Sequence, residues 1–184
     1  MINEEQKDID DKFREACISG DLEKVRYCLT SSELTFHANI HAIHPFRHAC
    51  QFGHLEIVKY LLTSPELKEH ASASQEEEIF LFSAVINKRL DVVKYLLGSP
   101  DLSIKPNLHI DDDLVFTNSC SKKDYDMLRY FITDLNIEKS NAISKYLERN
   151  PDPKVDSLFD MRELNSDLNK NLHNNYDNQR RPKV

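Results

Sequence analysis

An internal repeat constrains the fold of this chain more than any other feature. The segment GHLEIVKYLL, Gly53 to Leu62, returns as KRLDVVKYLL at Lys88 to Leu97. Aligned copies place similar residues in columns at intervals of 33, 35 and 35 residues, such as Leu22, Leu55, Leu90 and Tyr125, and then Tyr27, Tyr60, Tyr95 and Tyr130. Such a period indicates about four copies of one structural unit.

Each copy contains two short segments with helical periodicity. In the second copy they are PFRHACQF and HLEIVKYLLTS, where apolar residues recur every three or four positions. A tight turn separates the two segments, and Asp21 and Asp124 at this turn predict helix N-caps. Pro65 and Pro100 predict the end of the second helix.

Two helices of this length cannot bury their apolar faces alone, but stacked pairs can, so we predict an all-α solenoid. We expect repeats at about 8–43, 44–78, 79–113 and 114–137, a helical cap at 138–172 and a disordered tail at 173–184. The cap contains one helix at about 140–149 and another at about 154–172. The apolar face of that last helix consists of Val155, Leu158, Phe159, Met161, Leu164 and Leu168.

The repeat resembles that of ankyrin proteins. Gly53 to Leu62 is similar to the second half of an ankyrin repeat, and HPFRHA, His44 to Ala49, resembles its T-P-L-H-x-A start. The resemblance covers about residues 8–137, in a style similar to ankyrin proteins of bacteria and large viruses. It implies a protein that binds partners on its concave face. Copies three and four depart from the pattern because they lack the glycine at the inter-helix turn. The loops also lack the usual glycine, which leaves open whether they form β-hairpin fingers.

Four cysteines occupy apolar columns of the repeat. Cys17, Cys50 and Cys120 share a column with Val85, and Cys28 shares one with Leu61. We therefore predict buried, reduced thiols in a cytoplasmic protein. Equivalent positions in adjacent ankyrin repeats lie about 10 Å apart, too far for a disulfide.

The sequence predicts no catalytic, cofactor or metal site. It contains no nucleophile elbow, HExxH motif or phosphate loop, and three glycines in all are few. A histidine cluster has a spacing that zinc can use, but no cysteine or carboxylate completes it; its members are His37, His41, His44 and His48. A metal- or redox-sensing regulator is the least favoured alternative.

Acidic triplets open the first helix of copies three and four, at 76–78 and 111–113. One interpretation is a favourable interaction with the helix dipole. The other is an acidic ridge along the concave edge, beside the residues that precede each inter-helix turn. On the second interpretation the partner-binding residues are His41, Gln51, Phe52, Glu76, Glu77, Glu78, Asn87, Asp111, Asp112, Asp113 and Lys122.

We predict a non-enzymatic protein that binds another protein and is monomeric when unbound. The net charge of −7 disfavours nucleic acid as a partner, and the apolar runs are too short for a membrane span. The N-terminus predicts no signal peptide. Two roles remain open. One is an immunity protein or antitoxin that sequesters a basic partner, and the other is a pathogen effector or viral adaptor that docks on a host protein.

Overall fold

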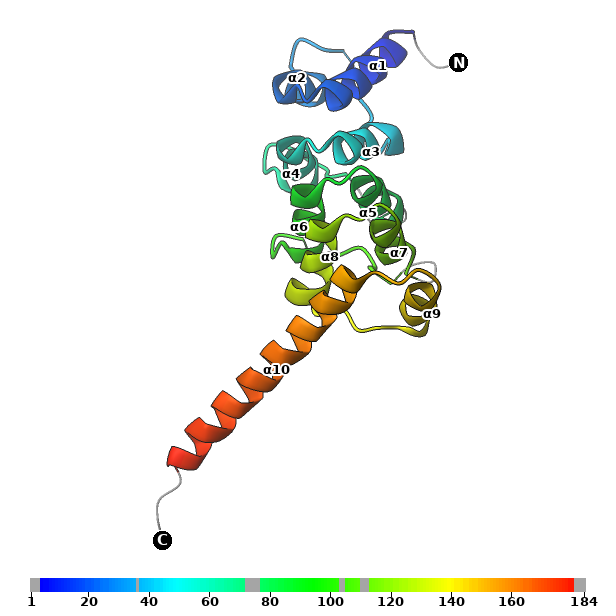
Figure 1. Cartoon of the computed structure of the whole chain (residues 1–184). Helices are drawn as coiled ribbons and strands as arrows, with labels where there is room; N and C mark the ends of the chain where they lie inside the picture. The colour runs from blue at the N-terminus through cyan, green and yellow to red at the C-terminus, as the bar shows by residue number, and fades with distance from the viewer. Residues whose placement is uncertain (1–3, 36, 72–76, 103–104, 110–112, 181–184) are drawn as a thin grey trace. The chain divides into compact units, whose positions relative to one another are not determined.

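The computed structural model describes residues 4–35, 37–71, 77–102, 105–109 and 113–180. Within these residues all regular secondary structure is helical, which confirms the predicted all-α class. The chain divides into two compact units, residues 1–110 and 111–184, and each is described by itself (Figure 1).

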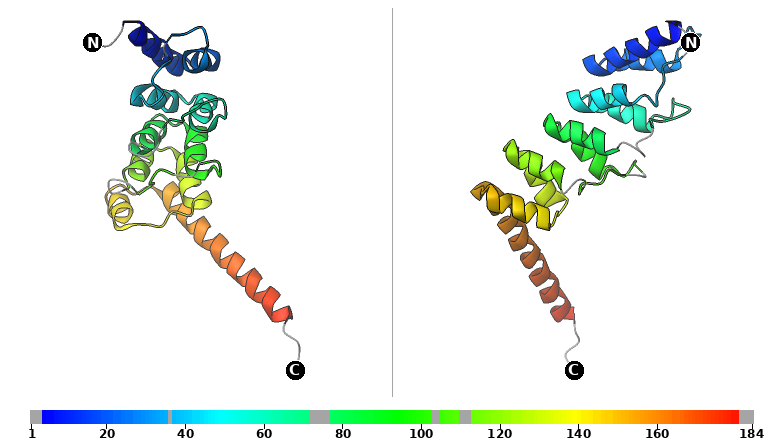
Figure 2. Two further views of the ribbon diagram at one scale, coloured as in Figure 1. Left: turned by 180° about the vertical axis from the view of Figure 1, so that it is seen from behind. Right: turned by 90° about the vertical axis from the view of Figure 1, so that its right-hand side faces the viewer.

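The first unit contains three helix pairs. The first helices of the pairs pack side by side in one layer, and the second helices form another layer (Figure 2). The first layer comprises α1 Glu4–Ser19, α3 Ile43–Phe52 and α5 Glu77–Ile86; the second comprises α2 Leu22–Thr30, α4 Leu55–Thr63 and α6 Leu90–Gly98.

Small residues allow the first-layer helices to approach closely. Ala16, Ala49 and Ala84 occupy one repeat column and have no exposed surface. Next to this column, the rings of Phe46 and Phe80 meet edge to face with their centroids 4.5 Å apart. The repeat columns found in the sequence are therefore the packing layers of the unit.

The inter-helix turns all use a left-handed residue. Gly20 and Gly53 have φ of 80° and 82°, and Lys88 and Lys123 at the equivalent positions have φ of 58° and 51°. Both predicted aspartate caps are confirmed, because the side chain of Asp21 accepts a hydrogen bond from the amide of Lys24, and Asp124 does the same for Met127. The missing glycines therefore leave the turn conformation unchanged.

The loops that follow the second helices close on themselves in a repeated way. Nε2 of His37 donates to the carbonyl oxygen of Ser31 at 3.0 Å, and His70 makes the same contact with Ser64 at 2.9 Å. The described residues of these loops contain no strand. Sequence comparison of the copies would have paired His37 with His70, so loop closure accounts for one member of the histidine cluster.

The second unit begins with another helix pair and ends with two further helices. Its elements are α7 Leu114–Ser121, α8 Tyr125–Arg129, η1 Tyr130–Asp134, α9 Asn141–Arg149 and α10 Pro153–Arg180. The second helix of the pair changes at Tyr130 from α to π geometry. Ser140 caps α9 by accepting from the amide of Ile143 at 3.1 Å, and the rings of Phe116 and Phe159 pack 6.0 Å apart.

Helix α10 differs from the expected cap in two respects. It continues past Leu172 to Arg180, through part of the segment expected to be disordered. Its first turns pack against α8 and η1 and bury Val155, Leu158 and Phe159. The rest of the predicted apolar face is exposed and consists of Met161, Leu164 and Leu168. The C-terminal part of α10 extends beyond the elements that its first turns pack on (Figure 1).

No helix in the described ranges is both long enough and apolar enough to span a bilayer.

Candidate partner-binding surface

The residues that precede the inter-helix turns of the first unit form a surface that we call the turn edge: Ile18, Gln51, Phe52 and Asn87. Phe52 ends α3 with 40% of its surface exposed, and its ring lies between those of His48 and His54, with centroid distances of 6.2 and 6.3 Å. Ile18 is also exposed. An aromatic side chain held in place on the surface suits a binding hot spot because little side-chain entropy is lost on contact.

Hydrogen bonds between neighbouring repeats hold the turn edge. Nε2 of His54 donates to the carbonyl oxygen of Ile18 at 2.9 Å, and Nε of Arg89 donates to that of Gln51 at 3.0 Å. Each donor begins the second helix of its own repeat and reaches back to the repeat before it. These bonds therefore hold the backbone at the end of α1 and at the end of α3.

Glycine makes room for these contacts. A Cβ atom on Gly20 would lie 2.6 Å from the His54 ring, and one on Gly53 would lie 2.8 Å from Cδ of Arg89. Neither His54 nor Arg89 is among the residues predicted from the sequence to bind a partner. Two features of the repeat could have indicated them. Glycine occupies the turn in copies one and two, before Asp21 and His54. In copies two and three the residue after the turn, His54 or Arg89, is not an aspartate that could cap the helix.

The remaining predicted residues of the first unit do not all lie on the turn edge. Asn87 does, although its side chain donates to the carbonyl oxygen of Ser83 at 2.8 Å. His41 is exposed in the loop before α3, with Nε2 3.0 Å from a carboxylate oxygen of Glu69. It therefore sits at the opposite end of α3 from Phe52.

Glu78, from the acidic triplet at 76–78, is also separate from the turn edge. Glu77 and Glu78 begin α5, and Glu78 is exposed. A ten-residue helix is about 15 Å long, so the Glu78 carboxylate lies at the far end of the first-layer helices from Phe52. Glu76, Asp111 and Asp112 lie outside the described residues, so the predicted ridge stays a prediction.

Two predicted residues belong to the second unit. Lys122 is exposed directly after α7. Asp113 is buried, and the hydroxyl of Ser140 donates to its carboxylate. Because Ser140 also caps α9, Asp113 joins the start of α7 to the start of α9 and is not available to a partner.

The four cysteines are free and buried, which confirms their predicted place in the core. Burial, and to a smaller extent Cys28, raises the pKa of Cys17 to about 12. Burial likewise raises the pKa of Cys120 to about 12, with a further contribution from Asp152, and raises the pKa of Cys50. Thiols with such pKa values are poor nucleophiles and poor metal ligands at neutral pH.

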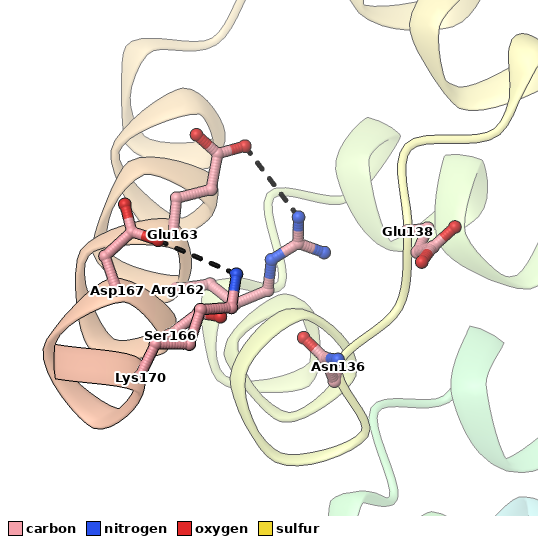
Figure 3. A pocket seen from close by; sticks show the side chains of 7 residues that line it. All are labelled: Asn136, Glu138, Arg162, Glu163, Ser166, Asp167 and Lys170. Carbon is pink, nitrogen blue, oxygen red and sulfur yellow. Dashed lines mark ion pairs between the residues drawn. The ribbon is translucent and has the colours of Figure 1, made fainter. Parts of the chain in front are cut away.

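Among the described residues, no group of three histidine, cysteine or carboxylate side chains could hold a metal ion. A polar pocket of about 370 Å³ in the second unit lies between α10 and the segment that follows η1 (Figure 3). Both cations of its lining have nearby partners: Arg162 donates to the carbonyl oxygen of Ile137 and lies 3.8 Å from Glu163, while Lys170 lies 3.8 Å from Asp167. With Glu138, three carboxylates and two cations line the pocket, and this set gives no reason to assign a small ligand.

Comparison with known proteins gives one family. The family described as Ankyrin repeats (3 copies) matches residues 13–110, more than half of the chain. No curated protein and no solved structure matches the chain.

Proposed function

The chain belongs to the ankyrin repeat family, and from that premise we propose that its first unit binds another protein along the turn edge and does no chemistry. Ankyrin repeats are generally protein–protein interaction modules and are typically non-enzymatic. The observation that carries the proposal is the exposed Phe52, whose ring lies near those of His48 and His54.

A basic protein is the partner class that we propose. The chain has a net charge of −7, which favours association with a positively charged surface and disfavours nucleic acid and anionic membrane. Sequestration of a basic protein, as by an immunity protein or antitoxin, is the role that this charge supports. The four buried, free thiols support a cytoplasmic location, where thiols remain reduced.

Affinity capture tests the proposal. The full chain and its F52A variant serve as baits in a lysate of the native cell, with Lys24→Ala on α2 as a matched control. We expect a protein that the wild type and the control both enrich and that F52A loses, since truncation of a hot-spot aromatic costs about 2 kcal/mol or more. Equal capture by F52A and wild type would show that the turn edge is not the binding surface.

A further inference from the structure

The most exposed large apolar side chains in the described part of the chain lie together on α10. Leu164 is 63% exposed, Leu168 54% and Met161 46%. Their spacing of three and then four residues places them on one face of the helix, and we call this set the α10 stripe. Single exposed apolar residues are common on proteins, but a contiguous set marks a contact surface.

Packing of the second unit does not account for the α10 stripe. The residues that anchor the helix to α8 and η1 are Val155, Leu158 and Phe159, all in its first two turns. Beyond them the helix extends away from α7, α8 and α9, as the views in Figure 2 show. The stripe lies mainly on this extended part.

A row of carboxylates runs beside the α10 stripe. The row consists of Asp156, Asp160, Glu163 and Asp167, all exposed, at spacings of four, three and four residues. With 3.6 residues per turn, the row lies roughly 100° around the helix from the stripe. The helix therefore presents an apolar face with one acidic edge.

Nearby cations neutralise this acidic edge only weakly. Asp156 lies 3.8 Å from Lys139, Glu163 lies 3.8 Å from Arg162, and Asp167 lies 3.8 Å from Lys170. In all three pairs the carboxylate is more than half exposed, and ion pairs of this kind contribute about 0–1 kcal/mol. The carboxylates therefore remain available to a second protein.

We propose that the α10 stripe and its acidic edge bind a basic amphipathic helix of another protein. The partner helix would place apolar residues on Met161, Leu164 and Leu168 and lysine or arginine residues along the acidic edge. Helix-in-groove and helix-on-helix contacts use this arrangement of apolar anchors and flanking charges. The proposal does not depend on the turn edge, which belongs to the other unit.

Charge also indicates where the basic residues of the partner helix lie and disfavours an antiparallel dimer of the chain. Arg129 and Lys154 line an apolar groove of about 430 Å³ at the N-terminal end of the stripe, where Met161 contributes to the wall. The basic residues of the partner therefore belong beside Asp160, Glu163 and Asp167. An antiparallel pair of two α10 helices would set their acidic edges against each other, which disfavours that dimer.

The test uses a synthetic helical peptide with leucines at three- and four-residue spacing and lysines along one flank. A second peptide carries glutamates in place of the lysines, and a third has the lysine peptide's composition in scrambled order. Binding to the full-length chain is measured by fluorescence anisotropy at low and high salt. We expect the lysine peptide to bind with an affinity that falls as salt rises, and the other two to bind much more weakly.

Variants locate the site. The double variant L164S/L168S should weaken binding of the lysine peptide about tenfold or more, because it removes the apolar anchors. The double variant D160N/E163Q should weaken binding mainly at low salt and reduce the salt dependence. Tyr27→Ser, on an exposed apolar residue of the first unit, is the matched control and should bind as wild type does.

Three outcomes would overturn the proposal. One is equal affinity of the chain for the lysine and glutamate peptides. Another is unchanged binding by L164S/L168S, with circular dichroism showing that the variant is folded. The third is a concentration-dependent dimer in analytical ultracentrifugation that L164S/L168S abolishes, which would assign the stripe to a second copy of the chain.

Discussion

Glycine occurs at two of the four inter-helix turns, although all four turns need a left-handed residue. A non-glycine residue in that conformation costs about 1–2 kcal/mol, and Lys88 and Lys123 tolerate it. The first two turns have an additional requirement, because the side chains of His54 and Arg89 occupy the space that a Cβ atom would fill. Glycine therefore occurs at the two turns that a side chain of the next repeat contacts.

A pair of substitutions separates these two requirements. Gly53→Ala should lower the free energy of unfolding by about 1–2 kcal/mol or more, since it adds left-handed strain and a contact with Arg89. Lys88→Gly, which removes a strained lysine at the equivalent turn, should leave that free energy unchanged or raise it. Urea denaturation followed by circular dichroism measures both. Equal stability of Gly53→Ala and wild type would refute the close approach of Arg89.

His48 makes stability depend on pH. Burial lowers the pKa of this side chain, and Nδ1 is a buried atom without a hydrogen-bond partner among the described residues. The unfolded chain therefore binds a proton more readily than the folded chain, and stability falls as the pH drops through about 6.5, the pKa of an unperturbed histidine.

Replacing His48 tests this effect. We expect wild type to lose more stability than His48→Gln when the pH changes from about 7.5 to about 5.5, because glutamine does not titrate. Unfolding by urea at both pH values gives the two differences. His41→Gln, at an exposed histidine, is the control, and a pH dependence of His48→Gln equal to that of wild type would contradict the argument.

At the scale of the helices, the alanine column sets the spacing of the first layer. Ala49 lies on α3, which packs between α1 and α5 and leaves this residue no exposed surface. Ala49→Asp would bury an unpaired carboxylate between helices, and we expect a loss of several kcal/mol. Thermal unfolding measures it, with Glu56→Asp on the exposed side of α4 as the control. A melting temperature equal to wild type would exclude the close packing of these helices.

Helix positions were predictable from the sequence, but the partners of each apolar face were not. Periodicity and the Ser-Pro signals locate α4 and α6 because local residues determine where those helices start and end. Periodicity also placed Leu158, Met161 and Leu164 on one apolar face of α10, yet it cannot show how far the neighbouring helices extend. Only the structure shows that burial stops after Phe159.

The candidate sites show the same difference between features that local sequence determines and features that distant contacts determine. The place of Phe52 directly before an inter-helix turn could be predicted, because that position depends on sequence alone. Asp113 was placed among the binding residues for its charge, whereas its burial depends on Ser140, which lies 27 residues away in the chain. The contacts of His54 and Arg89 with the preceding repeat are likewise nonlocal, so no pattern within one repeat predicts them.

At the scale of the whole chain, the two units present surfaces of different design. The turn edge is a short row at the ends of stacked helices, with Phe52 as its largest exposed side chain. The α10 stripe is the face of one long helix with a carboxylate edge. The two proposals rest on separate residues, so each can fail without the other.

This separation predicts a double dissociation. F52A should lose the protein captured from the native cell and bind the lysine peptide as wild type does, while L164S/L168S should show the reverse. The triple variant should lose both, with effects equal to the sum of the single ones, because substitutions without shared contacts usually act additively within about 0.5 kcal/mol. Capture and peptide anisotropy on the four proteins provide the measurement. If F52A weakened peptide binding, or if L164S/L168S abolished capture while folded, the two surfaces would have to contact one partner or be energetically coupled.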